Sequence, residues 1–288
     1  MVRVASVQSS VVFGNPKANT DFAIEHLRSL AAEKVQLAVF PECYLTGYCA
    51  NSEDEARGIA IECSPDSSYF ARLQAAVDEL EIMAVIGFAE ESEGRLYNSA
   101  ALLQPGLPLQ VYRKLHLPFI GFDRFATPGD ELPLYNTAVG RIAILICYDQ
   151  RPPEAARALA LEGADILCLP TNWPIGAEVS ADHVCIARAA ENRMHVITAN
   201  RIGSERGTDF IGRSKIIDAS GAVLASASDG SITLIADLDL ERARDKHVVI
   251  KPGEYEYDVL GTRRPDLYTK VQVSGHNDRT ACATTKPI

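Results

Sequence analysis

Several features are missing from this 288-residue sequence, and each absence excludes a class of protein. No apolar run approaches the roughly 20 residues that a membrane-spanning helix needs. Residues 1–8 are too polar, and their apolar part too short, for a signal peptide. Neither a Gly-x-Gly-x-x-Gly nor a P-loop pattern occurs, which disfavours nucleotide binding. The net charge of −10 argues against nucleic acid or an anionic membrane as the partner.

The cysteines lack the spacing of a disulfide framework or of a metal site. There are seven of them, an odd number, with no Cys-x-x-Cys pair and no Cys/His group at zinc spacing. We therefore expect reduced thiols in a cytoplasmic protein and no metal site.

Hydrophobic patterning predicts a large α/β domain. Short apolar runs alternate with amphipathic helical segments, and ten strands are more than one small sheet usually holds. Two stacked sheets with helices outside fit better than one doubly wound sheet. No Gly/Ser/Pro-rich linker and no repeat divides the chain, so we expect one domain over residues 1–270 and a polar tail over 271–288. The strands are expected at 2–8, 36–40, 82–89, 99–104, 111–114, 141–147, 166–170, 195–199, 214–218 and 232–237, and the helices at 16–33, 66–81, 153–162 and 177–193.

Three chemically capable residues stand at the ends of predicted strands. Cys147 ends the apolar run from Ile142, and a helix start at Pro152-Pro153 follows, so backbone N–H groups and the positive helix end can favour a thiolate there. Glu42 and Lys114 end two other runs. Taken singly, each residue also fits a structural role: a buried cysteine, a solvated carboxylate or a surface lysine.

The combination of segments resembles the nitrilase superfamily of carbon–nitrogen hydrolases. The resemblance covers residues 2 to about 270, and three motifs in register carry it. They are Phe40-Pro41-Glu42 with Thr46-Gly47-Tyr48, Tyr112-Arg113-Lys114-x-His116-Leu117, and Cys147-Tyr148-Asp149-x-Arg151-x-Pro153-Glu154. Weaker similarity lies at Asn98-Ser99-Ala100, Pro128-Gly129-Asp130, Arg188-Ala189-x-Glu191-Asn192 and Ala199-Asn200-Arg201.

The resemblance implies a four-layer α-β-β-α sandwich and a catalytic triad of Glu42, Lys114 and Cys147. Cys147 is then the nucleophile, and Glu42 is the general base and acid, with a pKa that burial raises. Lys114 and the backbone N–H of Tyr148 would stabilise the oxyanion. This chemistry requires no cofactor. The family usually has a second glutamate after the lysine, but here Asp123 is the nearest carboxylate, and it is equally well explained as a turn residue.

The residues after the cysteine favour the amidase and carbamoylase branches over nitrile-hydrolysing relatives. Our first choice is an amidase that releases ammonia from a small carboxamide; an N-carbamoyl amide hydrolase is the alternative, followed by a nitrilase. Tyr48, Asn172 and Trp173 are the candidate substrate-binding residues, and each also fits a structural role. Family resemblance implies a homodimer or higher homo-oligomer. Competing hypotheses are a non-catalytic scaffold of this fold and a Cys/His hydrolase using His116, His183 or His195.

Overall fold

The computed structural model describes residues 1–64 and 66–268. Met1–Lys246 form one compact unit, and a second unit begins at His247. The second unit contains the antiparallel strands β16 (His247–Lys251) and β17 (Tyr255–Asp258) and the short helix α7 (Pro265–Tyr268). The predicted tail, 271–288, lies outside the described residues, and the predicted domain boundary at residue 270 stays a prediction.

The first sheet of the large unit has seven strands in the order β15-β1-β2-β4-β5-β6, with β3 paired to β4. Strands β1, β2 and β4 run parallel, whereas β15, β5 and β6 complete the sheet in antiparallel pairs. The strands are β1 (Val2–Gln8), β2 (Leu37–Val39), β3 (Ile61–Glu62), β4 (Met83–Ser92), β5 (Arg95–Leu103), β6 (Gln110–Arg113) and β15 (Ile232–Leu238).

The second sheet has six strands in the order β14-β13-β10-β9-β8-β7, and its three central strands are parallel. A separate hairpin of β11 and β12 follows β10. The bounds are β7 (Leu134–Thr137), β8 (Gly140–Ile144), β9 (Ile166–Thr171), β10 (His195–Asn200), β11 (Ile202–Glu205), β12 (Thr208–Ile211), β13 (Lys215–Ile217) and β14 (Val223–Ser226).

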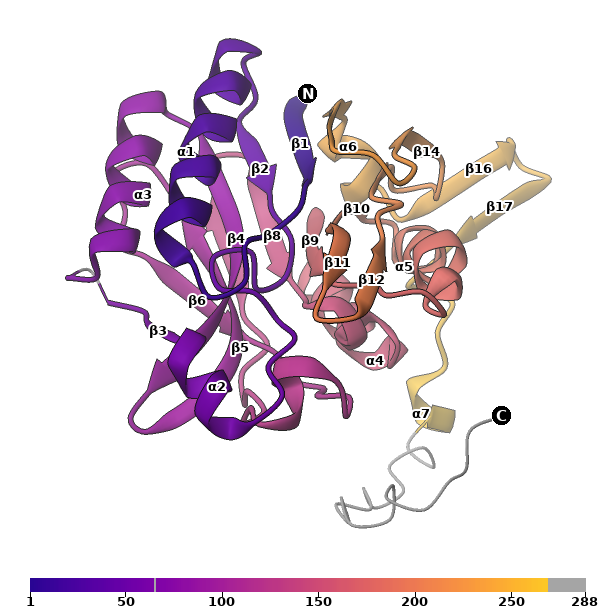
Figure 1. The fold of residues 1–288 in the computed structure, drawn as a ribbon. Helices are drawn as coiled ribbons and strands as arrows, with labels where there is room; N and C mark the ends of the chain where they lie inside the picture. Colours follow the sequence, from indigo (N-terminus) through magenta and orange to yellow (C-terminus); the bar gives the residue numbers. More distant parts are fainter. Residues whose placement is uncertain (65, 269–288) are drawn as a thin grey trace. The chain divides into compact units, whose positions relative to one another are not determined.

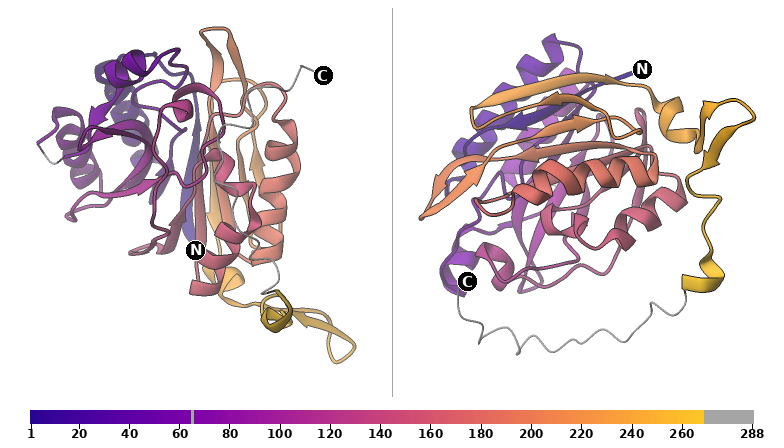
Figure 2. Two further views of the ribbon diagram at one scale, coloured as in Figure 1. Left: turned by 90° about the horizontal axis from the view of Figure 1, so that it is seen from below. Right: turned by 90° about the vertical axis from the view of Figure 1, so that its right-hand side faces the viewer.

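Helices cover the outer face of each sheet, so the large unit has four layers (Figures 1 and 2). The apolar sides of α1 and α3 pack on the first sheet, and those of α4 and α5 pack on the second. The predicted α-β-β-α sandwich is therefore confirmed. The helices are α1 (Pro16–Ala32), α2 (Glu53–Ile59), α3 (Ser68–Leu80), α4 (Pro153–Glu162), α5 (Cys185–Asn192) and α6 (Leu240–Arg244).

The largest apolar cluster joins the two sheets and the helices of the second. Val39 and Val85 of the first sheet and Leu167 of the second belong to it, and all three are fully buried. Burying an aliphatic side chain of this size contributes about 1.5–3 kcal/mol, so this cluster stabilises the pairing of the sheets. A buried hydrogen bond from the Ser6 hydroxyl to the carbonyl oxygen of Thr198, 2.7 Å, also links the two sheets.

One predicted helix is not regular throughout. In the alanine-rich segment predicted as helix 177–193, a wider π-helical turn over Ser180–Val184 interrupts the helix between Val179 and Cys185. Widened turns of this kind are common next to functional segments, and this one follows the loop after β9.

The strand directions bring several loops together. The carboxyl ends of parallel strands meet at one edge of a sheet, and the loops after β2, β8 and β9 all leave such ends. The loop after β2 reaches the second sheet directly, because the backbone N–H of Glu42 donates to the carbonyl oxygen of Thr171 at 3.4 Å.

Candidate active site

Cys147 occupies a strained turn at the edge of the second sheet. β8 ends at Ile144, and Cys147 begins a 3-10 turn that continues to Gln150, so the thiol lies three residues beyond the strand rather than at its last residue. Its φ of 48° is in the left-handed region, which costs a non-glycine residue of order 1–3 kcal/mol. The turn therefore holds Cys147 in a backbone conformation that an extended strand would not provide.

Glu42 is fully buried in the loop after β2, and a glycine on the neighbouring strand makes room for it. A Cβ atom on Gly87 of β4 would lie 2.5 Å from the carbonyl oxygen of Pro41 and 2.7 Å from the Cα atom of Glu42. The glutamate backbone can therefore approach the sheet only because residue 87 has no side chain.

Lys114 follows β6 and lies between two carboxylates. Its Nζ atom is 2.7 Å from Oε1 of Glu42 and 2.6 Å from Oδ2 of Asp123, and all three side chains are fully buried. Asp123 belongs to the 3-10 turn Gly121–Arg124, but it is not paired with Arg124, which binds the carbonyl oxygens of Gly121 and Ala50 instead. The structure thus brings Asp123 to the carboxylate–lysine cluster.

Asn98 lies at the centre of the site but was not among the predicted site residues. It is fully buried in β5, and its Nδ2 atom donates to Oε1 of Glu42 at 2.7 Å and to Oδ1 of Asp123 at 2.6 Å. Its segment, Asn98-Ser99-Ala100, is one of the shorter segments that resemble the nitrilase superfamily. An asparagine in an apolar strand is the signal that could have identified it, because a buried amide needs polar partners.

Tyr48 completes the surroundings of Asp123. Its hydroxyl donates to Oδ2 of Asp123 at 2.9 Å, and the carbonyl oxygen of Ile120 lies 3.1 Å from the same hydroxyl. Burial, followed by the charges of Asp123 and Glu42, raises the pKa of Tyr48 well above its usual value, so the hydroxyl remains a donor.

The charges of Glu42 and Lys114 follow from this arrangement. Burial raises the pKa of Glu42, against the opposing effect of Lys114, as the sequence analysis expected for a general base. Burial lowers the pKa of Lys114, but Asp123 and Glu42 outweigh it and hold that pKa well above the usual value, so the lysine stays cationic. Oε2 of Glu42 is buried and has no hydrogen-bond partner within the described residues.

The surroundings of Cys147 favour the protonated thiol in the free site. Burial, and then the charge of Glu42, raise the pKa of Cys147 well above its usual value. Lys114 and the backbone N–H of Asn172 act in the other direction but are outweighed. The thiol is therefore protonated at rest, and attack requires a base to remove its proton.

Asp149 ties the turn of Cys147 to the segment of Lys114. It is fully buried, and its Oδ2 accepts from the Ile146 backbone N–H at 3.0 Å and the Tyr112 hydroxyl at 2.7 Å. Its Oδ1 lies 2.8 Å from both the backbone nitrogen and Nδ1 of His116. His116 is thus bound to Asp149, whereas Glu42, Lys114 and Asp123 are the charged side chains that act most strongly on Cys147. This geometry disfavours a Cys/His hydrolase.

The other candidate substrate-binding residues, Asn172 and Trp173, lie after β9, and the oxyanion candidate Tyr148 follows Cys147. Both polar atoms of the Asn172 side chain are buried without a partner in the described part of the chain. Trp173 is also buried, within the same apolar cluster that Cys147 contacts, which agrees with the core role considered for it. The Tyr148 side chain is half-exposed beside the nucleophile. Which of these residues contacts substrate remains a prediction.

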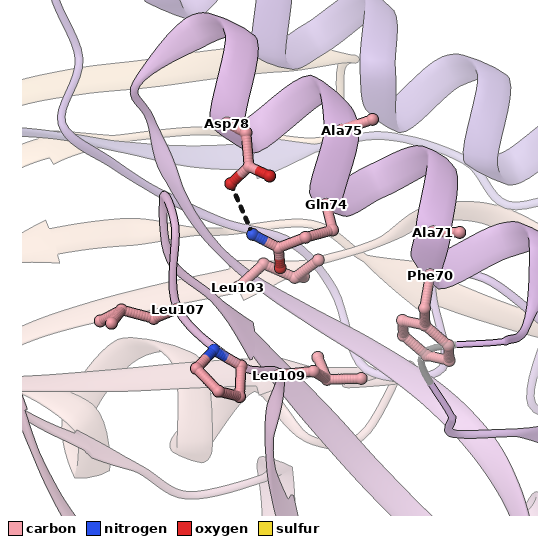
Figure 3. Close-up of a pocket in the computed structure, with 9 residues that line it drawn as sticks. Phe70, Ala71, Gln74, Ala75, Asp78, Leu103, Leu107 and Leu109 are labelled. Carbon is pink, nitrogen blue, oxygen red and sulfur yellow. Dashed lines mark hydrogen bonds between the residues drawn. The ribbon is translucent and has the colours of Figure 1, made fainter.

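A hollow lies away from these residues. It has a volume of about 300 Å³ between α3 and the β5–β6 connection, and Figure 3 shows Phe70, Gln74, Leu107 and Leu109 around it. None of the candidate catalytic residues lines it.

Within residues 1–64 and 66–268, no group of three or more His, Cys, Asp or Glu side chains could hold a metal ion. No helix in that part of the chain is long and apolar enough to cross a membrane.

Comparison with known proteins agrees with the fold and the motifs. The family described as carbon-nitrogen hydrolase matches residues 3–247. The chain is 33% identical to a nitrilase from Pyrococcus abyssi over 93% of this chain and 99% of the relative. It is 36% identical to an N-carbamoylputrescine amidase from Arabidopsis thaliana over 69% and 71% of the two chains.

A solved amidase structure from Nesterenkonia sp. AN1, in which acrylamide has added to the active-site cysteine, has the same fold. Its TM-score is 0.77 at 22% identity, covering 94% of this chain and 100% of that one. The chain belongs to the carbon–nitrogen hydrolase family, in the nitrilase superfamily. It is a hydrolase of carbon–nitrogen bonds other than peptide bonds.

Proposed function

We propose that this protein hydrolyses a small, uncharged carboxamide to a carboxylic acid and ammonia through a thioester on Cys147. The free oxygen of Glu42 carries the proposal. Oε1 of Glu42 already accepts two hydrogen bonds, from Lys114 and Asn98, whereas the buried Oε2 has no partner among the described residues. A buried carboxylate oxygen without a donor, beside a protonated thiol, suits a general base.

In the first half of the proposed reaction, Oε2 of Glu42 takes the thiol proton while the sulfur attacks the amide carbon. The carbonyl oxygen becomes an oxyanion. Lys114 has three N–H donors, and two bind Glu42 and Asp123, so the third can bind the oxyanion together with the backbone N–H of Tyr148. The tetrahedral intermediate then collapses: the C–N bond breaks, Glu42 returns the proton to nitrogen, and ammonia leaves.

In the second half, water attacks the thioester. Glu42 takes a proton from the water, the C–S bond breaks, and the same proton returns to the sulfur as the acid leaves. Asp123 takes no proton in this scheme, because Asn98, Lys114 and Tyr48 already donate to its two oxygens. It holds Lys114 in place, which is the role we propose for it in the position of the family's second glutamate.

The charge around the thiol favours an uncharged substrate. With both carboxylates ionised, Glu42, Asp123 and Lys114 together carry a net charge of −1, and all three side chains are buried. A substrate carboxylate placed next to it would be repelled with little screening.

An N-carbamoyl amide hydrolase is the second candidate, and the 36% identity to an N-carbamoylputrescine amidase specifically favours it. The same triad would attack the carbamoyl carbon, and a cationic amine on the leaving side is compatible with the net negative site. The identity of 33% to a nitrilase keeps nitriles as a third class to be measured. The catalytic cluster is complete, which argues against a non-catalytic scaffold.

Ammonia release from matched amides, N-carbamoyl amines and nitriles tests the proposal. The native protein and Cys147→Ala should be compared at equal concentration, with circular dichroism as the control for folding. We expect release from the carboxamides that the variant abolishes. Release from carbamoyl compounds alone would select the second candidate, and release that persists in Cys147→Ala would refute the thioester route.

A further inference from the structure

Asn98 occupies a position that the proposed reaction leaves without a task. It lies in the middle of β5, opposite Ala89 of β4, and its side chain is fully buried. Burying an amide in a strand costs free energy unless its polar atoms are bound. Both carboxylates of the site bind its Nδ2 atom, at 2.7 Å and 2.6 Å.

Cys43 fixes the orientation of this amide. The Cys43 sulfur lies 3.6 Å from Oδ1 of Asn98, and burial raises the pKa of Cys43 well above its usual value, so the group is a thiol that donates to that oxygen. The other end of the amide faces Glu42 and Asp123, which as carboxylates only accept. A reversed amide would place its oxygen against both carboxylates, so Nδ2 must face them.

The hydrogen bonds divide the two carboxylates into different roles. Asn98 and Lys114 both donate to Oε1 of Glu42, which leaves Oε2 without a donor. Asp123 has no such free oxygen, because Asn98 donates to Oδ1, and Lys114 and Tyr48 donate to Oδ2.

We propose that Asn98 is a positioning residue: by binding Oε1 of Glu42 and Oδ1 of Asp123 together, it turns Oε2 of Glu42 toward the thiol as the base. The inference rests on the proposed function for the reaction itself, but the geometry that it concerns does not depend on the substrate.

Removal of Asn98 has a defined electrostatic consequence. The titratable groups around Glu42 are Lys114, Asp123, Tyr48, Cys43 and Cys147. Without the amide, Lys114 is the one remaining donor to Oε1 of Glu42 within the described residues. Like charges at short range disfavour the ionised form. The Asn98 hydrogen bond lowers the pKa of Glu42, and its loss therefore raises that pKa further. Glu42 would then be protonated, and unable to act as a base, at a higher pH than in the native protein.

Asn98→Leu tests this, because leucine keeps the buried volume and removes both hydrogen bonds. Ser99→Ala is the matched control: Ser99 is the next residue of β5, equally buried, and donates to Oε2 of Glu90 at 2.6 Å rather than to the site. We expect Asn98→Leu to lower kcat/KM about tenfold to a hundredfold, as when a partner that orients a functional group is lost. The acidic limb of its pH profile should move to higher pH, while Ser99→Ala leaves the limb in place.

A substrate-independent measurement separates this inference from the proposed function. The Glu42 carboxyl carbon can be followed by ¹³C NMR in glutamate-labelled protein, with Glu42→Gln identifying its signal. A titration that moves to higher pH in Asn98→Leu supports the positioning role even if no amide is hydrolysed. An unmoved titration in the folded variant overturns it. If Asn98→Leu does not fold, Asn98→Ala, which also removes both hydrogen bonds, is titrated instead, and an unmoved Glu42 signal there also overturns the inference.

Discussion

Replacing Glu42 by glutamine removes the proposed base with little change of shape. The new amide oxygen can still accept from Lys114 and Asn98 in place of Oε1, and an NH₂ group replaces the free Oε2. Positioned bases contribute about 10²–10⁴ in rate. We therefore expect kcat/KM to fall by that factor, which corresponds to about 2.7–5.4 kcal/mol of barrier.

The same substitution has an opposite effect on the free thiol. The negative charge of Glu42 is one of the causes that raise the pKa of Cys147, so its removal lowers that pKa. Alkylation of Cys147 by iodoacetamide, followed by mass spectrometry across pH, should therefore begin at lower pH in Glu42→Gln than in the native protein. Hydrolysis falls while the sulfur becomes easier to ionise, a combination that general unfolding would not produce.

Glu90→Gln is the matched control for this experiment. Glu90 is also buried and bound to a cation, with Nη2 of Arg113 at 2.6 Å from its Oε1, but it lies outside the proposed machinery. We expect its activity and its alkylation profile to stay near those of the native protein. Near-native hydrolysis by Glu42→Gln would refute the assignment of the base, and an alkylation profile that does not move would contradict the proximity of Glu42 to the sulfur.

Three further predictions follow from other parts of the site. Gly87→Ala places a Cβ atom 2.5 Å from the Pro41 carbonyl oxygen. We expect chemical denaturation to show that the free energy of unfolding falls by about 1–3 kcal/mol. Unchanged stability together with unchanged activity would contradict the close approach. The hydrogen bond with Asp149 raises the pKa of His116 above its usual value near 6.5. The contribution of this pair to folding stability is therefore fully present below about pH 6.5. It is lost as the pH rises through the raised pKa of His116. Asp149→Asn should abolish this pH dependence in urea unfolding, and a dependence that persists would assign it to another group. Glu205 accepts from the backbone N–H groups of Tyr48 and Cys49, and it pairs with the buried Arg201. Because Glu205→Ala leaves the charge of Arg201 buried without this partner, we expect thermal or urea unfolding to show a destabilisation of about 3–5 kcal/mol. A loss below about 1 kcal/mol, the scale of an exposed ion pair, would show that Arg201 is solvated by other means.

The sequence predicted the central strands because long apolar runs have few alternatives. β1, β9 and β10 agree with their predicted positions to within a residue, and α4 agrees throughout. The shorter elements were missed: the hairpin β11–β12 has a mixed burial pattern without clear periodicity, and its pairing depends on tertiary contacts. The π-helical turn before α5 was also invisible, because the apolar pattern continues through it.

The candidate site could be predicted only in part. Local patterns gave no more than three polar residues at strand ends, and the resemblance to a family grouped them. Neither indicated that Asn98 would bridge two carboxylates, since that contact joins β5 to loops far away in the sequence. The local turn alone also does not indicate the protonation of Cys147, because burial and the charge of Glu42 outweigh it. Cytoplasmic location and a homodimer stay predictions.

The most direct test of the central claim is to trap the covalent intermediate. The native protein should be quenched in acid during turnover of a carboxamide and digested, and the peptide that contains Cys147 should be weighed by mass spectrometry. We predict that the peptide gains the mass of the acyl group, that the gain is lost with hydroxylamine, and that it is absent from Cys147→Ala. Continued ammonia release with an unmodified Cys147 peptide, under conditions where a control thioester survives the quench, would contradict covalent catalysis by this residue.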